Sequence, residues 1–272
     1  MLAFVHIPKT AGTTLHKIIS HQYSNRKIVI RHDADGPPTD ELIDQLTQPA
    51  ADAPEVVMGH MSVGLHHSVP GLRYVTCLRE PVSRVTSHYH HASNDPTHYL
   101  YRSIHEQKLT LENYTASGLS GELSNGMTRM LAGVDDFHST EVNQDTLKLA
   151  KHHLENHFTA ILLSEHFDEG LLMLSQELGW KTPYYIRRKV GTHSASKDRL
   201  KVKTRQVIEA DNMLDCELYQ WARDRFQNEW AARPRLHPAV KKFRKSNQVA
   251  GKAIFCLREA RRRVEKMMFS KH

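Results

Sequence analysis

The sequence contains few cysteines and no leading segment that directs it to a membrane. Its 272 residues include three cysteines, Cys77, Cys216 and Cys256. Three cysteines do not make a disulfide framework, which excludes the class of small disulfide-stapled secreted proteins and favours free thiols in a reducing compartment. No signal peptide or transmembrane run precedes the first apolar segment. We therefore expect a cytoplasmic protein of bacterial type, with peripheral contact to a membrane as the alternative.

Most of the chain, residues 1–239, has no net positive charge. The whole sequence has 37 Lys and Arg against 30 Asp and Glu, a net charge of +7. Residues 240–272 alone contain eleven Lys and Arg and two Glu, a net charge of +9, which leaves −2 for residues 1–239. A basic stripe over the main body, typical of nucleic-acid binding, is therefore missing, and we expect no nucleic-acid partner.

The sequence also lacks the phosphate-binding loop of common nucleotide-hydrolysing enzymes. That motif is Gly-x-x-x-x-Gly-Lys-Ser/Thr, in which the lysine directly follows the last glycine. Here Lys9 precedes Gly12 by three residues. No carboxylate that would hold Mg²⁺ is evident near this segment. Both absences disfavour a nucleotide-dependent kinase, which we keep as an alternative function.

An anion-binding turn is nevertheless present close to the N-terminus. Residues 4–7 favour a strand, and Gly12 permits close approach of the backbone to a ligand. Thr13 or Thr14 can cap the helix that follows. Because a helix N-terminus attracts phosphate or sulfate and Lys9 adds a positive charge, this turn predicts an oxyanion cradle. The competing interpretation is an ordinary capped turn with a surface lysine.

A second segment combines an apolar strand with groups that suit a phosphate. Residues 73–78 favour a strand, which Arg79 follows directly, and Pro81 suits the first turn of the next helix. An arginine fork binds phosphate in a bidentate manner, and Ser87 lies about two turns into that helix. The alternative is an ion pair between Arg79 and a carboxylate, with Ser87 facing solvent.

The apolar pattern predicts an α/β fold with a parallel sheet flanked by helices on both faces. We expect strands near 2–7, 27–31, 56–58, 72–78 and 158–163. We expect helices near 13–22, 40–47, 82–92, 144–156, 167–178 and 203–230, a loop at 33–39, and short helices and turns over 93–143 that shape the acceptor side. Ligands bind beyond the carboxyl ends of parallel strands, so Lys9, His60 and Arg79 are expected to converge there.

Together the two segments resemble the sulfotransferase superfamily, whose members have a P-loop-like sheet and use 3′-phosphoadenosine 5′-phosphosulfate (PAPS). The Pro-Lys-x-x-Gly-Thr-Thr turn and the later Leu-Arg-x-Pro-x-x-Arg-x-x-Ser run carry the resemblance. Weaker matches are Gly59-His60, residues 125–133 and residues 158–180, so the resemblance covers roughly residues 2–230. The branch that it resembles most contains heparan sulfate 2-O-sulfotransferase and uronyl 2-O-sulfotransferase.

The resemblance implies a role for each matching residue in transfer of a sulfuryl group to a hydroxyl, most simply of a carbohydrate. His60 would be the general base and Lys9 would contact the phosphosulfate near the scissile oxygen. Thr10, Ala11, Gly12, Thr13 and Thr14 would wrap the 5′-phosphate, Arg79 and Ser87 would bind the 3′-phosphate, and Arg188 and Lys197 would close over the nucleotide. The donor would be PAPS, the product 3′-phosphoadenosine 5′-phosphate (PAP), and no metal would be required. A non-catalytic nucleotide- or glycan-binding protein is the remaining alternative.

Histidine is abundant, with 20 residues, and several histidines lie near the predicted site. None of the pairs has the His-Glu-x-x-His spacing of a zinc protease, so we expect no metal. We assign His66, His88 and Arg129 to the binding of the acceptor.

The basic C-terminal segment is expected to form a separate unit. Breaks at Pro234 and Pro238 divide the chain into a sulfotransferase-like domain at 1–233 and a tail at 234–272. Apolar residues with near-helical spacing predict one basic amphipathic helix. They are Phe243, Ala250, Ile254, Leu257, Val264 and Met268. The helix can pack on the domain, self-associate, lie on an anionic membrane or bind an anionic polymer, and we favour packing.

Overall fold

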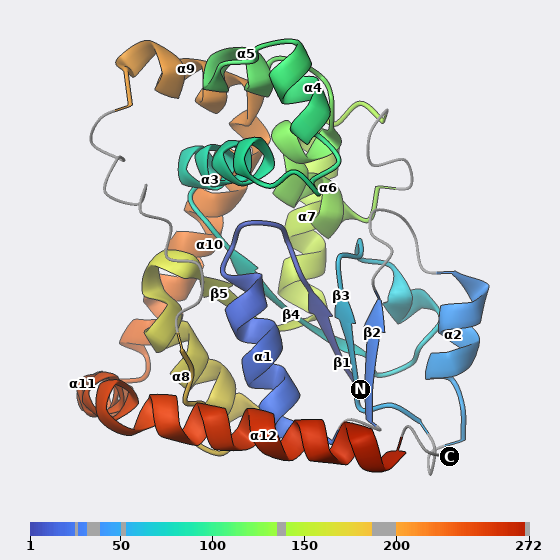
Figure 1. Cartoon of the computed structure of the whole chain (residues 1–272), viewed down its shortest axis with the longest axis vertical. Coiled ribbons are helices and arrows are strands. Elements are labelled where there is room, and N and C mark those ends of the chain that lie inside the picture. The colour runs from blue at the N-terminus through green and yellow to red at the C-terminus, as the bar shows by residue number, and fades with distance from the viewer. Residues whose placement is uncertain (25–26, 32–38, 50–52, 135–139, 187–199, 270–272) are drawn as a thin grey trace.

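A five-stranded parallel sheet forms the centre of the molecule (Figure 1). The computed structural model describes residues 1–24, 27–31, 39–49, 53–134, 140–186 and 200–269, and most of the predicted loop at 33–39 lies outside them. The strands are β1 Leu2–Val5, β2 Ile28–Arg31, β3 Val56–Gly59, β4 Arg73–Leu78 and β5 Phe158–Leu163, in the order β2-β3-β1-β4-β5. The predicted fold class is confirmed, and each predicted strand is present within three residues of its expected bounds.

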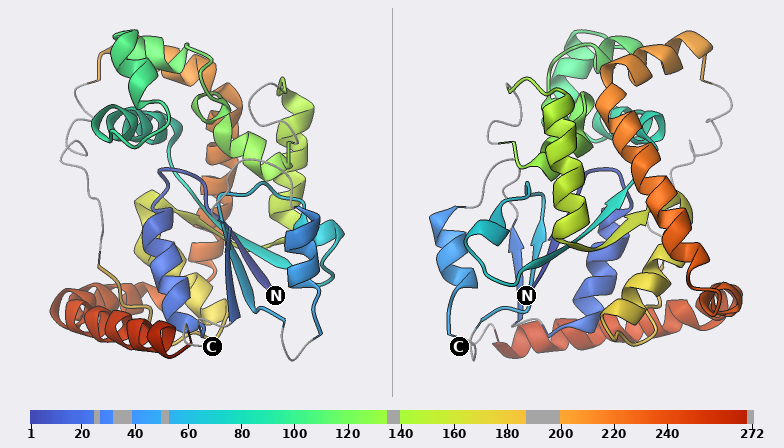
Figure 2. Two further views of the ribbon diagram at one scale, coloured as in Figure 1. Left: turned by 45° about the vertical axis from the view of Figure 1, so that its right-hand side comes forward. Right: turned by 180° about the vertical axis from the view of Figure 1, so that it is seen from behind.

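Helices cover both faces of the sheet (Figure 2). The helices α1 Gly12–Gln22 and α8 Phe167–Glu177 cover one face, and α7 Gln144–Asn156 and α10 Met213–Ala231 cover the other. The alternation of side chains along a strand divides the core accordingly. In β1, Leu2 and Phe4 pack with the α1 side, while Ala3 and Val5 pack with the α7 and α10 side.

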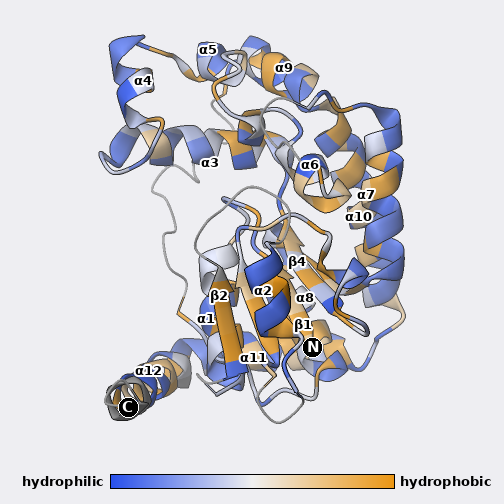
Figure 3. Ribbon diagram, turned by 90° about the vertical axis from the view of Figure 1, so that its right-hand side faces the viewer, coloured by the Kyte–Doolittle hydropathy of each residue, from blue (hydrophilic) through white to orange (hydrophobic). Residues whose placement is uncertain are grey.

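A second group of helices lies beyond the carboxyl ends of the strands (Figure 3). It consists of α3 Pro81–Asn94, α4 Tyr101–Glu106, α5 Leu111–Thr115, η3 Gly121–Leu123, α6 Gly126–Ala132 and α9 Val202–Asp211. The short elements from α4 to α6 confirm the mixture of helices and turns predicted for residues 93–143. The remaining short helix, α2 Asp40–Leu46, contributes Leu42 and Leu46 to the core on the α7 side.

The single helix predicted over 203–230 is wrong, because the chain breaks at Asn212 into α9 and α10. Asn212 has the non-helical dihedral angles φ −123° and ψ 34° and is fully buried. Its amide group donates to the Leu123 carbonyl at 2.8 Å, and its side-chain oxygen accepts from the Asn125 backbone at 3.0 Å. The break is therefore fixed by contacts with a distant segment that helical periodicity does not reveal.

The C-terminal segment also differs from the single helix that we predicted. It consists of α11 Leu236–Ser246, a π-helical turn at Asn247–Gly251 and α12 Lys252–Phe269. Since a π turn adds a residue to the helical repeat, it rotates the face that follows. Phe243 before the turn and Phe255 after it are both buried, whereas Leu257 and Val264 are 70% and 55% exposed.

The inner side of this segment packs against the α/β core. Arg244 forms an ion pair with Asp168 at 2.8 Å, and Glu259 of α12 accepts hydrogen bonds from Lys17 and His21 of α1. The segment therefore has the packing role that we favoured, while self-association and membrane contact through its outer side remain predictions. Within the described ranges, no helix is both long and apolar enough to cross a bilayer.

Five histidine rings gather around η2 Leu65–His67 and the end of α7. They belong to His66, His67, His152, His153 and His157, and the His66 ring lies 4.0 Å from both the His67 and the His157 ring. Burial and then the charges of His157, His67 and His153 lower the pKa of His66 from 6.5 to about 4. No group of three or more His, Cys, Asp or Glu in the described part of the chain is arranged to hold a metal.

We predict that this cluster makes the protein less stable in acid. Between pH 6.5 and about 4 the unfolded chain binds a proton at His66 that the folded chain does not bind. The free energy of unfolding should therefore be highest above pH 6.5 and should decrease as the pH falls from 6.5 to about 4. Urea unfolding at pH 7.5 and pH 5 should show a smaller decrease for His66→Gln than for the wild type. A decrease equal to that of the control His105→Gln, an exposed histidine on α4, would contradict the prediction.

Candidate functional site

The turn between β1 and α1 forms a strained loop whose backbone faces a pocket. Lys9 and Ala11 have φ angles of 68° and 69°, in the left-handed region that side chains other than glycine seldom adopt. Ala11 is the N-cap of α1 and no side chain caps this helix, so the predicted cap by Thr13 or Thr14 is wrong. The N–H groups of an uncapped first turn attract an anion, as the sequence predicted for this cradle.

The pocket has a volume of about 420 Å³ and lies at the carboxyl ends of the strands, because its lining residues His6, His60 and Arg79 follow β1, β3 and β4 directly. Its first wall is the cradle, with Pro8, Lys9, Ala11, Gly12, Thr13 and Thr14, followed by His6, His60, Arg79 and Ser87. Thr10 is the exception among the predicted cradle residues, because its buried hydroxyl donates to the Ile7 carbonyl at 2.8 Å and braces the loop. Lys9, His60 and Arg79 follow three different strands and meet in this pocket, as predicted.

The imidazole rings of His6 and His60 stack on each other, and the His6 ring packs against Gly12 of the cradle. The His6 and His60 rings lie 4.3 Å apart, at an angle of 23°. A Cβ atom on Gly12 would lie 1.9 Å from the Cδ2 atom of His6, so only glycine leaves room for this ring. Burial, followed by the neighbouring His60, His16 and Lys9, lowers the pKa of His6 from 6.5 to about 3. His6 therefore stays neutral beside His60 at physiological pH.

Arg79 connects the two segments that carry the predicted nucleotide site. Its Nη1 atom donates to the Lys9 carbonyl at 2.9 Å, and within the described residues no carboxylate pairs with it. Burial lowers the pKa of Arg79, and the charges of Glu165 and Glu80 act in the opposite direction. The next helix, α3, begins at Pro81 as predicted, and the Glu80 side chain caps it by accepting from Val82 and Ser83.

The second wall of the pocket contains residues that the sequence did not identify. They are His98, Tyr99 and Glu122. His91, which the sequence placed near the site, also lines the pocket, as does His88. His88 is 2% exposed, and its Nδ1 and Nε2 atoms contact the Tyr114 hydroxyl and the Glu122 carboxylate. Both ring nitrogens of His88 are therefore occupied by protein partners. This corrects the predicted direct contact of His88 with the acceptor, because its ring holds Glu122 instead. The Glu122 carboxylate lies 34 residues along the chain from its partner His88, so no local motif signals it.

Two other residues assigned to the acceptor lie outside the pocket. His66 belongs to the histidine cluster and contacts the Tyr74 hydroxyl through Nδ1 at 3.2 Å. Arg129 is 8% exposed and donates to the backbone carbonyls of Ser124 and Thr140. Arg129 therefore braces α6, which corrects the assigned acceptor contact. Arg188 and Lys197 lie outside the described residues.

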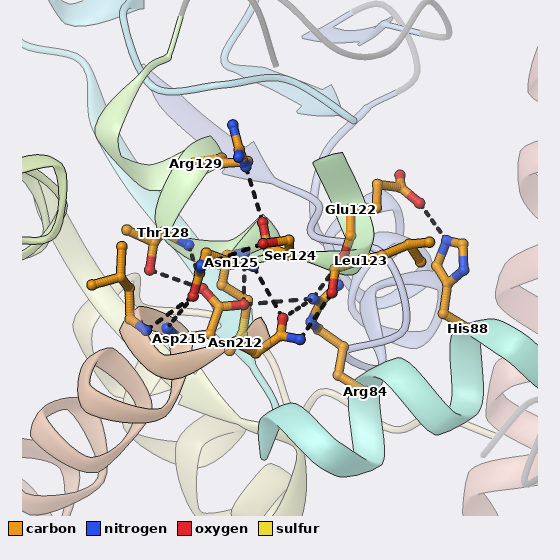
Figure 4. A network of polar contacts seen from close by, with 12 residues as sticks. Arg84, His88, Glu122, Leu123, Ser124, Asn125, Thr128, Arg129, Asn212 and Asp215 are labelled. Atoms are coloured by element: carbon orange, nitrogen blue, oxygen red, sulfur yellow. Dashed lines mark hydrogen bonds and ion pairs between the residues drawn. The ribbon is translucent and has the colours of Figure 1, made fainter. Parts of the chain in front are cut away.

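A buried polar network fixes the second wall to the helix that bears Ser87 (Figure 4). The Asp215 carboxylate, which is fully buried, accepts from the backbone N–H groups of Met127 and Thr128 at the start of α6. In return, the Asn125 side chain accepts from the backbone N–H groups of Leu214 and Asp215 at the start of α10. Two helices thus cap each other reciprocally.

Arg84 of α3 completes this network from the pocket side. Its Nη2 atom donates to the Glu122 carbonyl at 2.8 Å and lies 3.5 Å from both Asp215 Oδ2 and Asn212 Oδ1 (Figure 4). Arg84 is 1% exposed, so its charge depends on this buried carboxylate. The position of Glu122 is therefore set by the same contacts that hold α3, α6 and α10 together.

These features define an α/β protein with a pocket at the carboxyl ends of its parallel strands, lined by Lys9, Arg79 and the start of α1. A family model for galactose-3-O-sulfotransferases matches residues 1–267, and the chain belongs to this family of carbohydrate sulfotransferases. The carbohydrate sulfotransferase predicted from the sequence is confirmed, but the match does not support the narrower heparan sulfate 2-O-sulfotransferase branch.

Individual relatives are distant. The chain is 26% identical to galactosylceramide sulfotransferase of Bos taurus over 191 residues, which cover 66% of this chain and 44% of the relative. Mouse sulfotransferase SULT7A1, solved as a complex with PAP, is 12% identical with a TM-score of 0.40, over 79% of this chain and 65% of that one. A sulfotransferase from Alicyclobacillus acidocaldarius is 13% identical with a TM-score of 0.44, over 84% of this chain and 98% of that one.

We predict that Asp215→Ala destabilises the protein by about 3 kcal/mol or more, because it uncaps α6 and leaves the Arg84 charge buried without its carboxylate. Urea unfolding followed by circular dichroism measures this change. Asp224→Ala, an exposed position on the same helix, should change stability by at most about 0.5 kcal/mol. Equal effects of the two substitutions would contradict the role of the network.

We predict that Gly12→Ala costs about 1–3 kcal/mol, since the added methyl group displaces the His6 ring. His6→Ala should remove this clash, so the double variant should be more stable than the sum of the two single changes predicts. A double-mutant cycle of urea midpoints tests the contact. Simple additivity would show that Gly12 does not accommodate His6.

Proposed function

We propose that the protein transfers a sulfuryl group from PAPS to a hydroxyl of a galactose-containing acceptor. The observation that carries this proposal is the convergence of Lys9, His60 and Arg79 in one pocket of a chain that belongs to the galactose-3-O-sulfotransferases. The cytoplasmic location expected from the sequence, and the division into a domain at 1–233 and a tail at 234–272, are part of this proposal.

The cradle fits the phosphate groups of the nucleotide. The first turn of α1, with Thr13 and Thr14, presents N–H and hydroxyl donors where the 5′-phosphate is expected, and Arg79 and Ser87 provide the site for the 3′-phosphate. PAPS supplies an activated sulfuryl group, and PAP is the product that the same residues hold. Arg79 also fixes the Lys9 carbonyl, which couples the two phosphate sites.

Lys9 and His60 have complementary roles in the transfer. The Lys9 ammonium group provides a preorganised positive charge for the negative charge that develops on the bridging oxygen. The His60 imidazole accepts the proton of the attacking hydroxyl as a general base. The neutral His6 ring stacks on His60 and restricts its orientation without adding a second positive charge. The residues position and neutralise charge, and no metal is required by this scheme.

Transfer of radiolabelled sulfuryl groups from PAPS to a galactoside tests this proposal. We predict that His60→Ala lowers kcat by roughly 100-fold or more, because the general base is lost, and leaves the affinity for PAP within a few-fold. His105→Ala, an exposed histidine on α4, is the matched control and should retain wild-type kcat. A His60→Ala enzyme with near-normal turnover would refute its role, and a wild-type protein that transfers nothing would refute the function.

A further inference from the structure

The pocket continues beyond the residues that the proposed function uses. Its second wall, formed by the end of α3, residues 95–100 and η3, presents a carboxylate and an exposed aromatic ring to the same cavity as His60. The proposed function assigns no role to the carboxylate, Glu122, or to the ring, Tyr99.

Glu122 is held so that it presents an acceptor of hydrogen bonds. It is 7% exposed, and its Oε2 atom contacts His88. Burial raises the pKa of Glu122, but the hydrogen bond from His88 and the charges of His88, Arg84 and His60 outweigh this effect and lower it overall. Within the described part of the chain, its Oε1 atom has no hydrogen-bond partner. An ionised carboxylate accepts only, so Oε1 matches a hydroxyl donor.

Tyr99 provides an apolar surface next to this carboxylate. Its side chain is 57% exposed, although large aromatic rings usually lie largely buried. The ring stacks on His98, with centroids 4.8 Å apart and an interplanar angle of 21°. Burial and the neighbouring His88 and His91 lower the pKa of His98 from 6.5 to about 4, so the pair is uncharged near neutral pH.

One buried hydroxyl fixes the distance between the two groups. The Ser120 Oγ atom accepts from the Tyr99 hydroxyl at 2.8 Å and from the Glu122 backbone N–H at 3.2 Å. Ser120 is 4% exposed, and the Arg84 bond to the Glu122 carbonyl holds the same turn from the other side. The ring and the carboxylate therefore form a rigid pair, as a preformed binding site requires.

We propose that Tyr99 and Glu122 form the acceptor subsite and select a neutral sugar. The apolar face of a pyranose ring would lie on Tyr99, and one of its hydroxyls would donate to Glu122. A uronic acid would bring a second negative charge to the buried carboxylate, which is unfavourable, so the site discriminates against acidic sugars. This inference rests on the proposed function, because it assigns the acceptor of that same pocket.

Saturation-transfer NMR with methyl β-D-galactopyranoside tests the subsite without turnover, beside methyl β-D-glucuronide. The galactoside signal should be strong for the wild type and lost in Tyr99→Ala, a variant whose folding is checked by circular dichroism because the Tyr99 hydroxyl bonds Ser120. Tyr101→Ala, on the neighbouring helix and outside the pocket, is the matched control. Glu122→Gln should weaken galactoside binding by roughly 10- to 100-fold, the value of a hydrogen bond to a charged group, and reduce the preference over the glucuronide.

Steady-state kinetics separates this inference from the proposed function. With PAPS as donor, both pocket variants should raise KM for the galactoside while the calorimetric affinity for PAP stays within a few-fold. Unchanged galactoside binding and KM in Tyr99→Ala and Glu122→Gln, or wild-type preference for the glucuronide, would overturn the subsite. A wild type that binds the galactoside through Tyr99 but transfers nothing would refute the proposed function and leave the subsite standing.

Discussion

The geometry of the pocket depends on the buried exchange between Asp215 and Asn125. The Asp215 side chain caps α6, and the Asn125 side chain caps α10. Arg84 of α3 joins this network through its contacts with the Asp215 carboxylate and the Glu122 carbonyl. Buried charges and helix termini are costly when their partners are missing, so these segments must form together. The helix that bears Ser87 and the turn that bears Glu122 are consequently placed by one network, and the two walls keep a fixed separation.

The pocket has two halves of different electrostatic character. The cradle side has the uncapped terminus of α1 together with Lys9 and Arg79, and it suits a phosphorylated nucleotide. The opposite side has an ionised carboxylate and a neutral aromatic pair, and it suits an uncharged hydroxyl-rich ligand. His60 lines the cavity between them. In the reaction that we propose, an anionic donor and a neutral acceptor would bind at different walls, with His60 as the proton acceptor between them, which is the arrangement that transfer requires.

Patterns of neighbouring residues in the sequence predicted those features of the fold that depend on neighbouring residues. The strands, the cradle near Lys9 and the start of α3 at Pro81 follow from apolar runs and residue-specific backbone preferences, and all three are present. The break at Asn212 and the rotated face of α12 depend on a distant hydrogen bond and on a π turn, which periodicity does not encode. Arg129 and His66, both assigned to the acceptor, contact backbone carbonyls and other histidines instead. The sequence does not indicate a role for Glu122, because its partner His88 is 34 residues away.

The central claim is that this pocket recognises a nucleotide with a 3′-phosphate. Calorimetric titration of the purified protein with PAP, beside ADP and ATP, tests it most directly. We predict tight binding of PAP, much weaker binding of the two nucleotides without a 3′-phosphate, and loss of PAP binding in Arg79→Ala. Equal binding of ATP and PAP, or no binding of PAP, would contradict it.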